Sequence, residues 1–353
     1  MKATLQTVAD AVGVSRSTVS NAYSRPDQLS TPLRERILAT AAELGYPGPH
    51  AAARSLRKGR AGAVGVLFTA NLSYAFVDPY AVQFLRGLAE SAERHDTGLL
   101  LLPLSHDDAE SAERKVRHAV VDGFCVYNVP EWHRSRSVLA TLGLPIVTTE
   151  YRPQADQAGV GVDDRAACRT VAEHLMQWGH RDVAVVSVFD APGNDRPTEV
   201  TDIDAVPAYE ARQRLLGIRD AVVGAGVDWS TVTVLNASAN SRDAGRTAAS
   251  QLLDRTARPS AIIACTDVIA LGVIDAMNDR RLRPGVDVSV TGFDDIPEAS
   301  AYGLSTIRQP AVDRGVIAAE LLLDPPPDPA DRHVLLPTEL VIRSSTGSPT
   351  KRR

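Results

Sequence analysis

Short apolar runs alternate with amphipathic stretches along most of the chain after residue 60. The runs have the length of buried strands and cover residues 64–68, 99–102, 124–127, 146–149, 183–188, 261–264 and 286–291. The stretches between them repeat apolar residues at helical spacing and cover residues 81–94, 109–121, 166–178, 208–223, 242–253, 270–278 and 312–323. This alternation predicts parallel sheets covered by helices, the doubly wound α/β class.

This part of the chain is too long for one comfortable hydrophobic core, so we expect two subdomains within residues 61–345. In this fold class ligands bind beyond the carboxyl ends of the strands and between subdomains. We expect a disordered tail over residues 346–353. The first subdomain is expected to combine residues 61–162 with 294–323, and the second to combine residues 163–293 with 324–345.

The first 47 residues have a different pattern, which predicts three short helices. Ala9, Gly13 and Val19 have the spacing of a helix-turn-helix, in which a small residue lies at the helix crossing, a glycine turns the chain and a branched residue packs opposite. An ordinary three-helix subdomain is the alternative. The expected helices cover residues 5–12, 16–23 and 32–44, with Thr4, Ser15 and Thr31 as their N-caps.

Charge is distributed unevenly along the chain. The whole chain has 38 Lys and Arg against 43 Asp and Glu, whereas residues 1–60 have nine basic and four acidic residues. A basic head on an acidic body is typical of a polyanion-binding module joined to another domain, although a solvated surface has the same charge pattern. Together with the helix-turn-helix spacing, it favours DNA binding.

The second helix of the head offers an outward polar row for a major groove. Arg16 can present a guanidinium fork to guanine, and Asn21 can bind adenine or a phosphate. Arg16 and Ser17 are the first candidates and Asn21 is the next, whereas Thr18 and Ser20 are better suited to phosphate contacts, which set the register without reading sequence.

Three stretches of the head and of the segment after it form a recognisable set: residues 4–21 (TLQTVADAVGVSRSTVSN), the pair Gly45 and Tyr46, and residues 52–57 (AARSLR). With these stretches the chain resembles the opening of LacI/GalR-type bacterial transcription regulators. The resemblance implies an all-α helix-turn-helix head plus hinge helix, joined to an α/β periplasmic-binding-protein-like (type I) core of two doubly wound subdomains. It also implies a homodimer that binds near-palindromic operator DNA. The DNA-binding candidates in the head are Thr4, Leu5, Ser15, Arg16, Ser17, Thr18, Ser20, Asn21, Arg25 and Tyr46.

Residues 48–60 are expected to form a hinge between the head (1–47) and the core (61–345). Residues 51–58 have good helix propensity but span only about two turns, too short for a stable isolated helix. The resemblance implies that two such hinge helices meet in the minor groove, where Leu56 is inserted between base pairs and Arg54 and Arg57 bind phosphates. A plain linker, with Leu56 packed on the core, is the alternative.

Carboxylates recur at the predicted strand ends, a pattern suited to a hydroxyl-rich small molecule because a carboxylate accepts two hydrogen bonds. Helix N-capping is an equally good explanation for any single acid, above all Asp164 and Asp267. The family resemblance places Arg214, Asp294 and Glu150 at effector-binding positions and Asn240 where some relatives have a stacking aromatic. The polar loop 192–206 is also expected near the site. The effector-binding candidates are Tyr74, Phe76, Asp78, Tyr127, Glu150, Arg214, Asp267 and Asp294.

Enzyme and metal motifs are missing from the sequence, which has no P-loop, HExxH, GxSxG or complete GxGxxG. Three scattered cysteines disfavour a disulfide framework and a zinc site, and neither a signal peptide nor a membrane span is visible. We therefore expect a cytoplasmic, nucleoid-associated regulator without cofactor or metal. A repressor is favoured over an activator.

The effector is expected to be a small polar metabolite, with a sugar favoured. A nucleobase, nucleoside or other non-sugar ligand is the alternative. Other classes of protein that share parts of this pattern are an exported sugar-binding protein, an α/β enzyme and a structural nucleoid protein.

Overall fold

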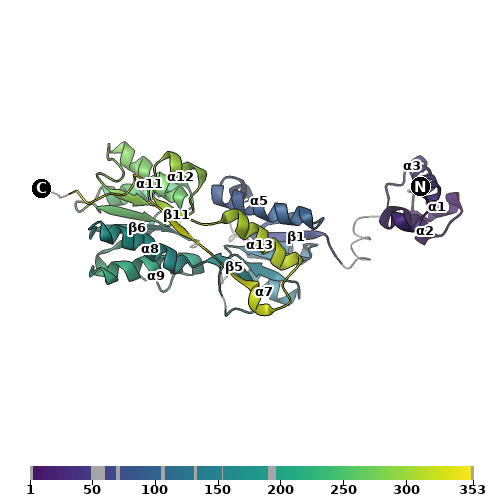
Figure 1. Cartoon of the computed structure of the whole chain (residues 1–353), viewed down its shortest axis with the longest axis horizontal. Coiled ribbons are helices and arrows are strands. Elements are labelled where there is room, and N and C mark those ends of the chain that lie inside the picture. The colour runs from purple at the N-terminus through teal and green to yellow at the C-terminus, as the bar shows by residue number, and fades with distance from the viewer. Residues whose placement is uncertain are drawn as a thin grey trace. The chain divides into compact units, whose positions relative to one another are not determined.

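The computed structural model describes residues 3–48, 60–68, 72–104, 108–130, 133–152, 154–189 and 196–350 (Figure 1). The chain divides into two compact units, Met1–Gly62 and Ala63–Arg353. No helix in these ranges is long and apolar enough to cross a bilayer.

The first unit contains α1 (Leu5–Val12), α2 (Arg16–Ser24), the 3-10 turn η1 (Pro26–Gln28) and α3 (Thr31–Glu43). Both expected caps of the helix-turn-helix are confirmed, since the Thr4 side chain accepts from Thr7 N and that of Ser15 accepts from Thr18 N. Gly13 turns the chain with a φ of 74°. The third cap is corrected: Thr31 is already helical and Ser30 precedes it as N-cap, because Pro32 is tolerated anywhere in a first turn. The core of this unit is Val8, Ala9, Val19, Ala22, Ile37 and Ala41.

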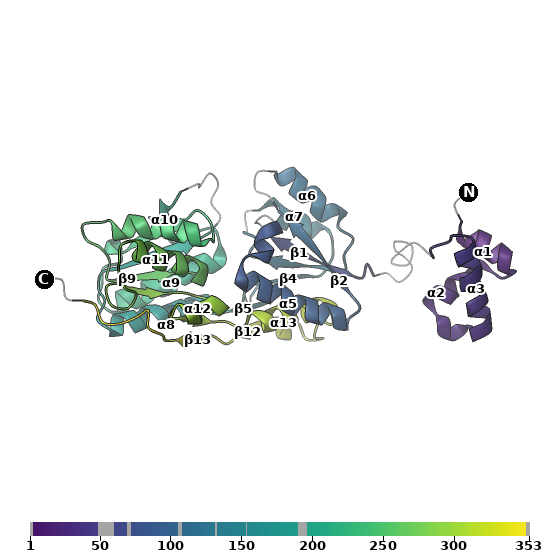
Figure 2. The same cartoon turned by 90° about the horizontal axis from the view of Figure 1, so that it is seen from above.

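The second unit contains two large sheets with helices on both faces (Figure 2), and a separate two-stranded sheet. The sheet of the first subdomain is parallel throughout and has the strand order β12-β5-β4-β3-β1-β2. Its strands are β1 (Ala63–Phe68), β2 (Gly98–Pro103), β3 (Gly123–Tyr127), β4 (Ile146–Thr148), β5 (Ala158–Val162) and β12 (His333–Leu336). The helical elements are η2 (Leu72–Phe76), α5 (Pro79–Arg94), α6 (Ala109–His118), α7 (Arg134–Thr141), α13 (Ala311–Leu323) and η4 (Pro329–Arg332).

The second subdomain has the strand order β10-β9-β6-β8-β7, parallel except for the β7–β8 pair. Its strands are β6 (Val183–Val188), β7 (Thr198–Glu199), β8 (Thr233–Ala237), β9 (Ala261–Ala264) and β10 (Ser289–Thr291). Its helical elements are α8 (Asp164–Gln177), α9 (Tyr209–Gly224), η3 (Trp229–Thr231), α10 (Arg242–Leu253), α11 (Asp267–Asp279) and α12 (Pro297–Ala301). The expected doubly wound class is confirmed for both halves.

The chain passes between the subdomains through a separate antiparallel pair, β11 (Thr306–Arg308) and β13 (Glu339–Val341). This corrects the expected division of the later residues. Residues 294–305 remain with the second subdomain, where Thr291 pairs with Ser305. Residues 333–336 belong to the first subdomain, because β12 finds its parallel partner in β5.

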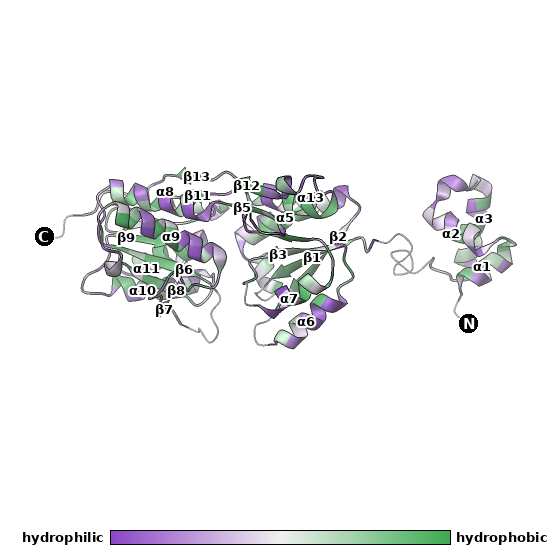
Figure 3. Ribbon diagram, turned by 90° about the horizontal axis from the view of Figure 1, so that it is seen from below, coloured by the Kyte–Doolittle hydropathy of each residue, from purple (hydrophilic) through white to green (hydrophobic). Residues whose placement is uncertain are grey.

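Three helix pairs pack so closely that glycine is required between them. On α13, a Cβ added to Gly315 would lie 2.1 Å from Phe84 O of α5, and one added to Gly87 of α5 would lie 1.9 Å from Val312 O. Gly217 of α9 and Gly272 of α11 meet α8 and α10 in the same way. Hydrophobic residues gather in the strands and on the helix faces turned toward them (Figure 3).

We expect Gly315→Ala to lower the free energy of unfolding by about 1–3 kcal/mol, because the α5–α13 pair would have to separate. The measurement is equilibrium denaturation in urea. Gly224→Ala is the matched control, since a Cβ there meets nothing within 4 Å. Equal stability of the two variants would contradict the close packing of α5 and α13.

The C-terminal segment up to residue 350 is fixed to the second subdomain, which corrects the expected disorder for residues 346–350. His180 bonds to Gly347 O at 2.8 Å through Nε2 and to Ser260 Oγ at 2.8 Å through Nδ1. His174 Nε2 lies 3.1 Å from Thr346 Oγ1. These hydrogen bonds to buried histidines hold residues 346–350 in place, although the polar composition of this segment predicted disorder.

Burial lowers the pKa of His180 below its usual range, with the Gly347 carbonyl opposing the shift. The unfolded chain therefore binds a proton more readily than the folded chain, and the stability from neutral His180 is lost as the pH falls through the usual histidine pKa. We expect the thermal midpoint to fall between pH 7.5 and pH 5.5, less so in His180→Gln. The same pH dependence in that variant would contradict the role of His180.

Candidate functional sites

The start of α2 presents a cluster of polar side chains on the surface of the head. Arg16 and Ser17 are exposed and Thr18 is half-buried. Ser15 Oγ lies 2.6 Å from Ser17 Oγ and 2.8 Å from Thr18 Oγ1, so the cap organises the hydroxyl groups beside it. Asn21 is a turn further on, half-buried, and donates to Gln28 Oε1 at 3.4 Å.

The other residues expected to contact DNA differ in how exposed their side chains are. Ser20 is buried, so the structure does not place it in the outward row, because α2 turns this position toward the other helices. Arg25 is exposed just beyond α2, and Thr4 is exposed at the start of α1. Leu5 and Tyr46 pack partly against the core of the head. The hinge candidates Arg54, Leu56 and Arg57 lie outside the described residues.

Arg214 is the centre of the expected effector site. It lies on α9 and is nearly buried, at 9% exposure. Its Nε donates to Asp164 Oδ1 at 2.7 Å, its Nη1 donates to Cys265 O at 2.7 Å, and its guanidinium lies 3.9 Å from the centre of the Phe293 ring. Asp164 therefore pairs with Arg214, and Asp163 supplies the N-cap of α8.

Asp294 follows β10 in an unusual backbone conformation. Its φ is 131° and that of Asp295 is 54°, values that residues with a side chain rarely adopt and that concentrate at functional sites. Asp294 Oδ1 accepts from Gln309 Nε2 at 2.6 Å. Burial raises the pKa of Asp294 well above its usual range, and the charge of Arg214 partly offsets this shift.

Three polar atoms around Arg214 have no hydrogen-bond partner within the described part of the chain: Arg214 Nη2, Asp164 Oδ2 and Asp294 Oδ2. None of the three is completely buried. We call them the open polar atoms. One donor and two acceptors are thus available to a small molecule.

Tyr74 and Asp78 reach the second subdomain from the first. Asp78 caps α5 by accepting from Tyr80 N at 2.9 Å, and it also accepts from the Tyr74 hydroxyl. Asn240 Nδ2 donates to Tyr74 OH at 2.8 Å and to Asp78 Oδ2 at 3.1 Å. Asn240 Oδ1 accepts from Thr266 Oγ1 at 2.7 Å. Asn240, which stands where some relatives have a stacking aromatic, therefore forms a polar link between the subdomains.

The remaining residues expected to bind effector differ in their exposure and in the side chains that they contact. Phe76 is 63% exposed on η2. The ring of Tyr127 is buried, with centroids 5.1 Å from Phe68 and 4.9 Å from Phe84, so no ring face is open for stacking. Glu150 lies between two arginines, 3.2 Å from Arg136 and 2.7 Å from Arg152.

Asp267 is fully buried and both of its carboxylate oxygens are used inside the protein. Oδ1 accepts from Thr306 Oγ1 at 2.6 Å, and Oδ2 accepts from Ile296 N at 2.9 Å. These bonds tie the start of α11 to β11 and α12, and Thr266 is the N-cap of α11. The expectation that Asp267 binds effector is therefore corrected, because its two oxygens already hold the fold together.

The sequence interpretation missed a buried charged pair at the same junction. Arg314 of α13 donates to Glu210 Oε1 of α9 at 2.8 Å and to Tyr80 OH at 2.8 Å. Asn128, with its amide nitrogen oriented toward Glu210, donates to Oε2 at 2.7 Å. Burial raises the pKa of Glu210 to about 7, with Arg314 opposing the shift. The available sequence signal was an arginine on the apolar face of a predicted helix.

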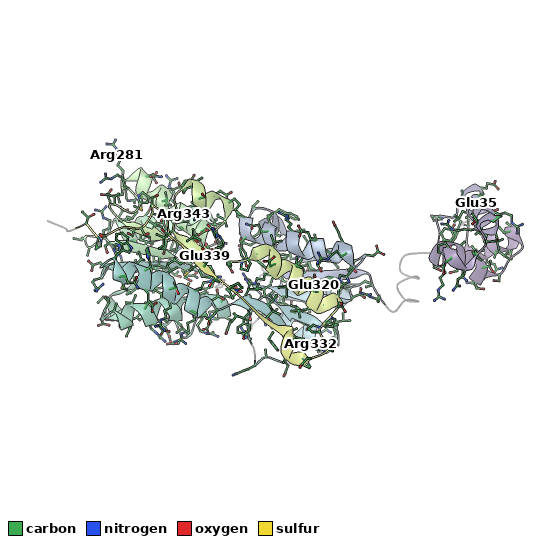
Figure 4. The ribbon with its side chains drawn as sticks, in the orientation of Figure 1. Glu35, Arg281, Glu320, Arg332, Glu339 and Arg343 are labelled. Carbon is green, nitrogen blue, oxygen red and sulfur yellow. The ribbon has the colours of Figure 1, made fainter. Side chains whose placement is uncertain are left out.

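The crossover strands are tied to the segment after β10 by a second group of charges. Asp295 accepts from Arg308 at 2.7 Å and from Arg343 at 2.7 Å, and Arg308 also pairs with Glu339 at 2.8 Å. Arg343 and Glu339 lie along this crossover in Figure 4. In the described part of the chain, no group of three or more His, Cys, Asp or Glu side chains could hold a metal ion.

Comparison with known proteins agrees with this arrangement. Residues 4–47 match the family model "Bacterial regulatory proteins, lacI family", and residues 172–346 match a periplasmic binding protein-like domain. An HTH-type transcriptional regulator, Rv3575c of Mycobacterium tuberculosis, is 38% identical over 99% of this chain and 98% of its own. The chain belongs to the lacI family of bacterial regulatory proteins.

Two further relatives extend this lacI-family comparison. The crystal structure of a LacI-family transcriptional regulator from Corynebacterium glutamicum is 32% identical, with a TM-score of 0.73 over 99% of this chain and all of that chain. The Ribose operon repressor of Haemophilus influenzae is 27% identical over 97% of this chain and 98% of its own. This lacI-family protein is a transcription regulator, and members of the family are not enzymes.

Proposed function

We propose that this lacI-family regulator is a repressor that binds a near-palindromic operator as a homodimer and is controlled by a small, hydroxyl-rich effector. Two identical heads related by a twofold axis would each read one half-site, so the operator would share that symmetry. The observation that supports DNA reading is the exposed polar cluster at the start of α2.

In this proposal Arg16 reads guanine with its guanidinium fork, and Asn21 binds adenine or a phosphate. Ser17 faces the groove beside Arg16, and Thr18 contacts the DNA backbone, where its hydroxyl group fixes the register of the helix. Leu56 is inserted between base pairs in the minor groove, with Arg54 and Arg57 on the flanking phosphates. The hinge that carries these three residues would order only when it is bound, since two turns are marginally stable alone.

The open polar atoms support an uncharged effector rich in hydroxyl groups. Arg214 Nη2 can donate to a hydroxyl oxygen, while Asp164 Oδ2 and Asp294 Oδ2 can accept from two hydroxyl groups. Arg214 is already paired with the Asp164 carboxylate, which would repel a phosphate, so a free sugar is favoured over a sugar phosphate.

Effector control would act through the arrangement of the two subdomains. The crossover residues Gln309 and Arg308 contact Asp294 and Asp295, which adjoin the open polar atoms. A ligand that prefers one arrangement of the subdomains shifts the population toward it, and the hinge attachment would shift with it.

The test is selection of genomic DNA fragments by the purified full-length protein, followed by sequencing with and without a panel of free sugars. We expect enrichment of a symmetrical sequence, and weaker enrichment with at least one sugar. The control is a protein that lacks residues 1–60, which should enrich nothing. Absence of any enriched symmetrical sequence in all conditions would contradict the proposed function.

A further inference from the structure

Asn240 joins the two subdomains through hydrogen bonds from both its amide nitrogen and its amide oxygen. Its amide nitrogen donates to Tyr74 OH and Asp78 Oδ2, which belong to the first subdomain. Its oxygen accepts from Thr266 Oγ1, which belongs to the second. Both partners in the first subdomain are themselves fixed, since Asp78 also caps α5. The link is therefore a continuous chain of hydrogen bonds from α5 to α11.

Glu210 and Arg314 make a second link between the same two subdomains. Their side chains are 13% and 3% exposed, and their charged atoms are 2.8 Å apart. Beside them, the guanidinium of Arg152 lies 3.9 Å from the centre of the Tyr209 ring. A buried ion pair that is fully hydrogen-bonded is strongly disrupted when one partner is removed, so this link resists separation of the subdomains.

The charge of Arg214 acts on groups that also interact with both links. The charges acting on Asp294 are those of Arg214, Asp267 and Asp78, and Asp78 is the residue bound to Asn240. The charges acting on Glu210 are those of Arg314, Asp164, Arg214 and Glu150. The open polar atoms are thus close enough to both links to interact with their charged groups.

We propose that Asn240 is a built-in latch that, together with the Glu210–Arg314 pair, holds the two subdomains in contact before effector binds. The effector then meets a site that is already assembled, and it adds to or competes with contacts that the protein makes with itself. A ligand shifts the equilibrium between two arrangements of the subdomains only by its preference for one of them. The latch therefore sets the populations of the two arrangements before the effector acts on them.

The latch identifies Asn240 as a positioning residue. The link needs an amide nitrogen as donor between a hydroxyl and a carboxylate. An aspartate of the same shape at this position would lose the donor and bring a second carboxylate to Asp78. The proposal rests on the proposed function only in taking the junction as the effector site.

The experiment compares hydrogen exchange in the full-length wild type and Asn240→Asp, without effector and without DNA. We expect exchange of peptides covering residues 73–82 and 238–244 to rise roughly tenfold in the variant, because the lost bond involved a charged acceptor. Peptides over β9 and over the head should not change. The matched control is Asn278→Asp, which makes the same change at an exposed position on α11.

The double variant Asp78→Asn/Asn240→Asp exchanges the donor and the acceptor and keeps an N-capping residue at position 78. We expect it to restore wild-type exchange at the junction, which a residue important only for local packing would not do. Exchange in Asn240→Asp equal to that of wild type, or no restoration in the double variant, would overturn the latch. Either result leaves the DNA selection experiment unaffected, so failure of the latch and failure of the proposed function are distinguishable.

Discussion

Replacing Arg16 with alanine is expected to weaken binding to the selected operator by about 1–3 kcal/mol, roughly a 5- to 150-fold loss of affinity, and to relax the preference at one base pair of each half-site. Arg16 is the first residue of α2 and its side chain is exposed, so its removal leaves the core of the head unchanged. The measurement is fluorescence anisotropy with the operator and with the same operator altered at each guanine.

The control for Arg16 is Arg117→Ala, which removes the same charge from the exposed end of α6 in the second unit. It should leave operator affinity unchanged. A loss in Arg16→Ala that is equal for the operator and for unrelated DNA would show that Arg16 contacts only phosphates. An unchanged affinity would contradict its assignment to the groove.

Replacing Arg214 with lysine is expected to reduce the affinity for the effector roughly 100-fold or more, the cost of losing a buried, charge-assisted contact. Lysine keeps a positive charge near Asp164, so the carboxylate is not left alone in the interior. It cannot reproduce a planar fork that bonds Asp164 and Cys265 O and still offers Nη2. The measurement is the thermal shift produced by each free sugar that stabilises the wild type.

Arg165→Lys is the matched control for Arg214, since Arg165 makes a similar pair with Asp220 between α8 and α9 at the surface. It should respond to the effector as the wild type does. Operator affinity without effector should stay within a few-fold of wild type in both variants. A full effector response in Arg214→Lys would remove Arg214 from the site.

The sequence was most informative where structure depends on neighbours along the chain. Thr4, Gly13 and Ser15 each act within a few residues of their own position, and the structure confirms all three. The sequence was less informative for β5, whose residues alternate with glycine. Gly159 and Gly161 are needed because Glu150 O and Tyr151 N pass close to them, a contact that no local pattern indicates.

By itself, the sequence determined the two-part organisation, the helix-turn-helix, the doubly wound class and the family, because periodicity, capping and motifs are local properties. Only the tertiary structure decided that Asp267 is used by the fold, that β12 joins β5, and that Asn240, Glu210 and Arg314 link the subdomains. Each of these depends on partners far apart in the chain, such as Asn240 with Asp78, and the free energy of a buried polar group is set by whichever partners folding brings to it.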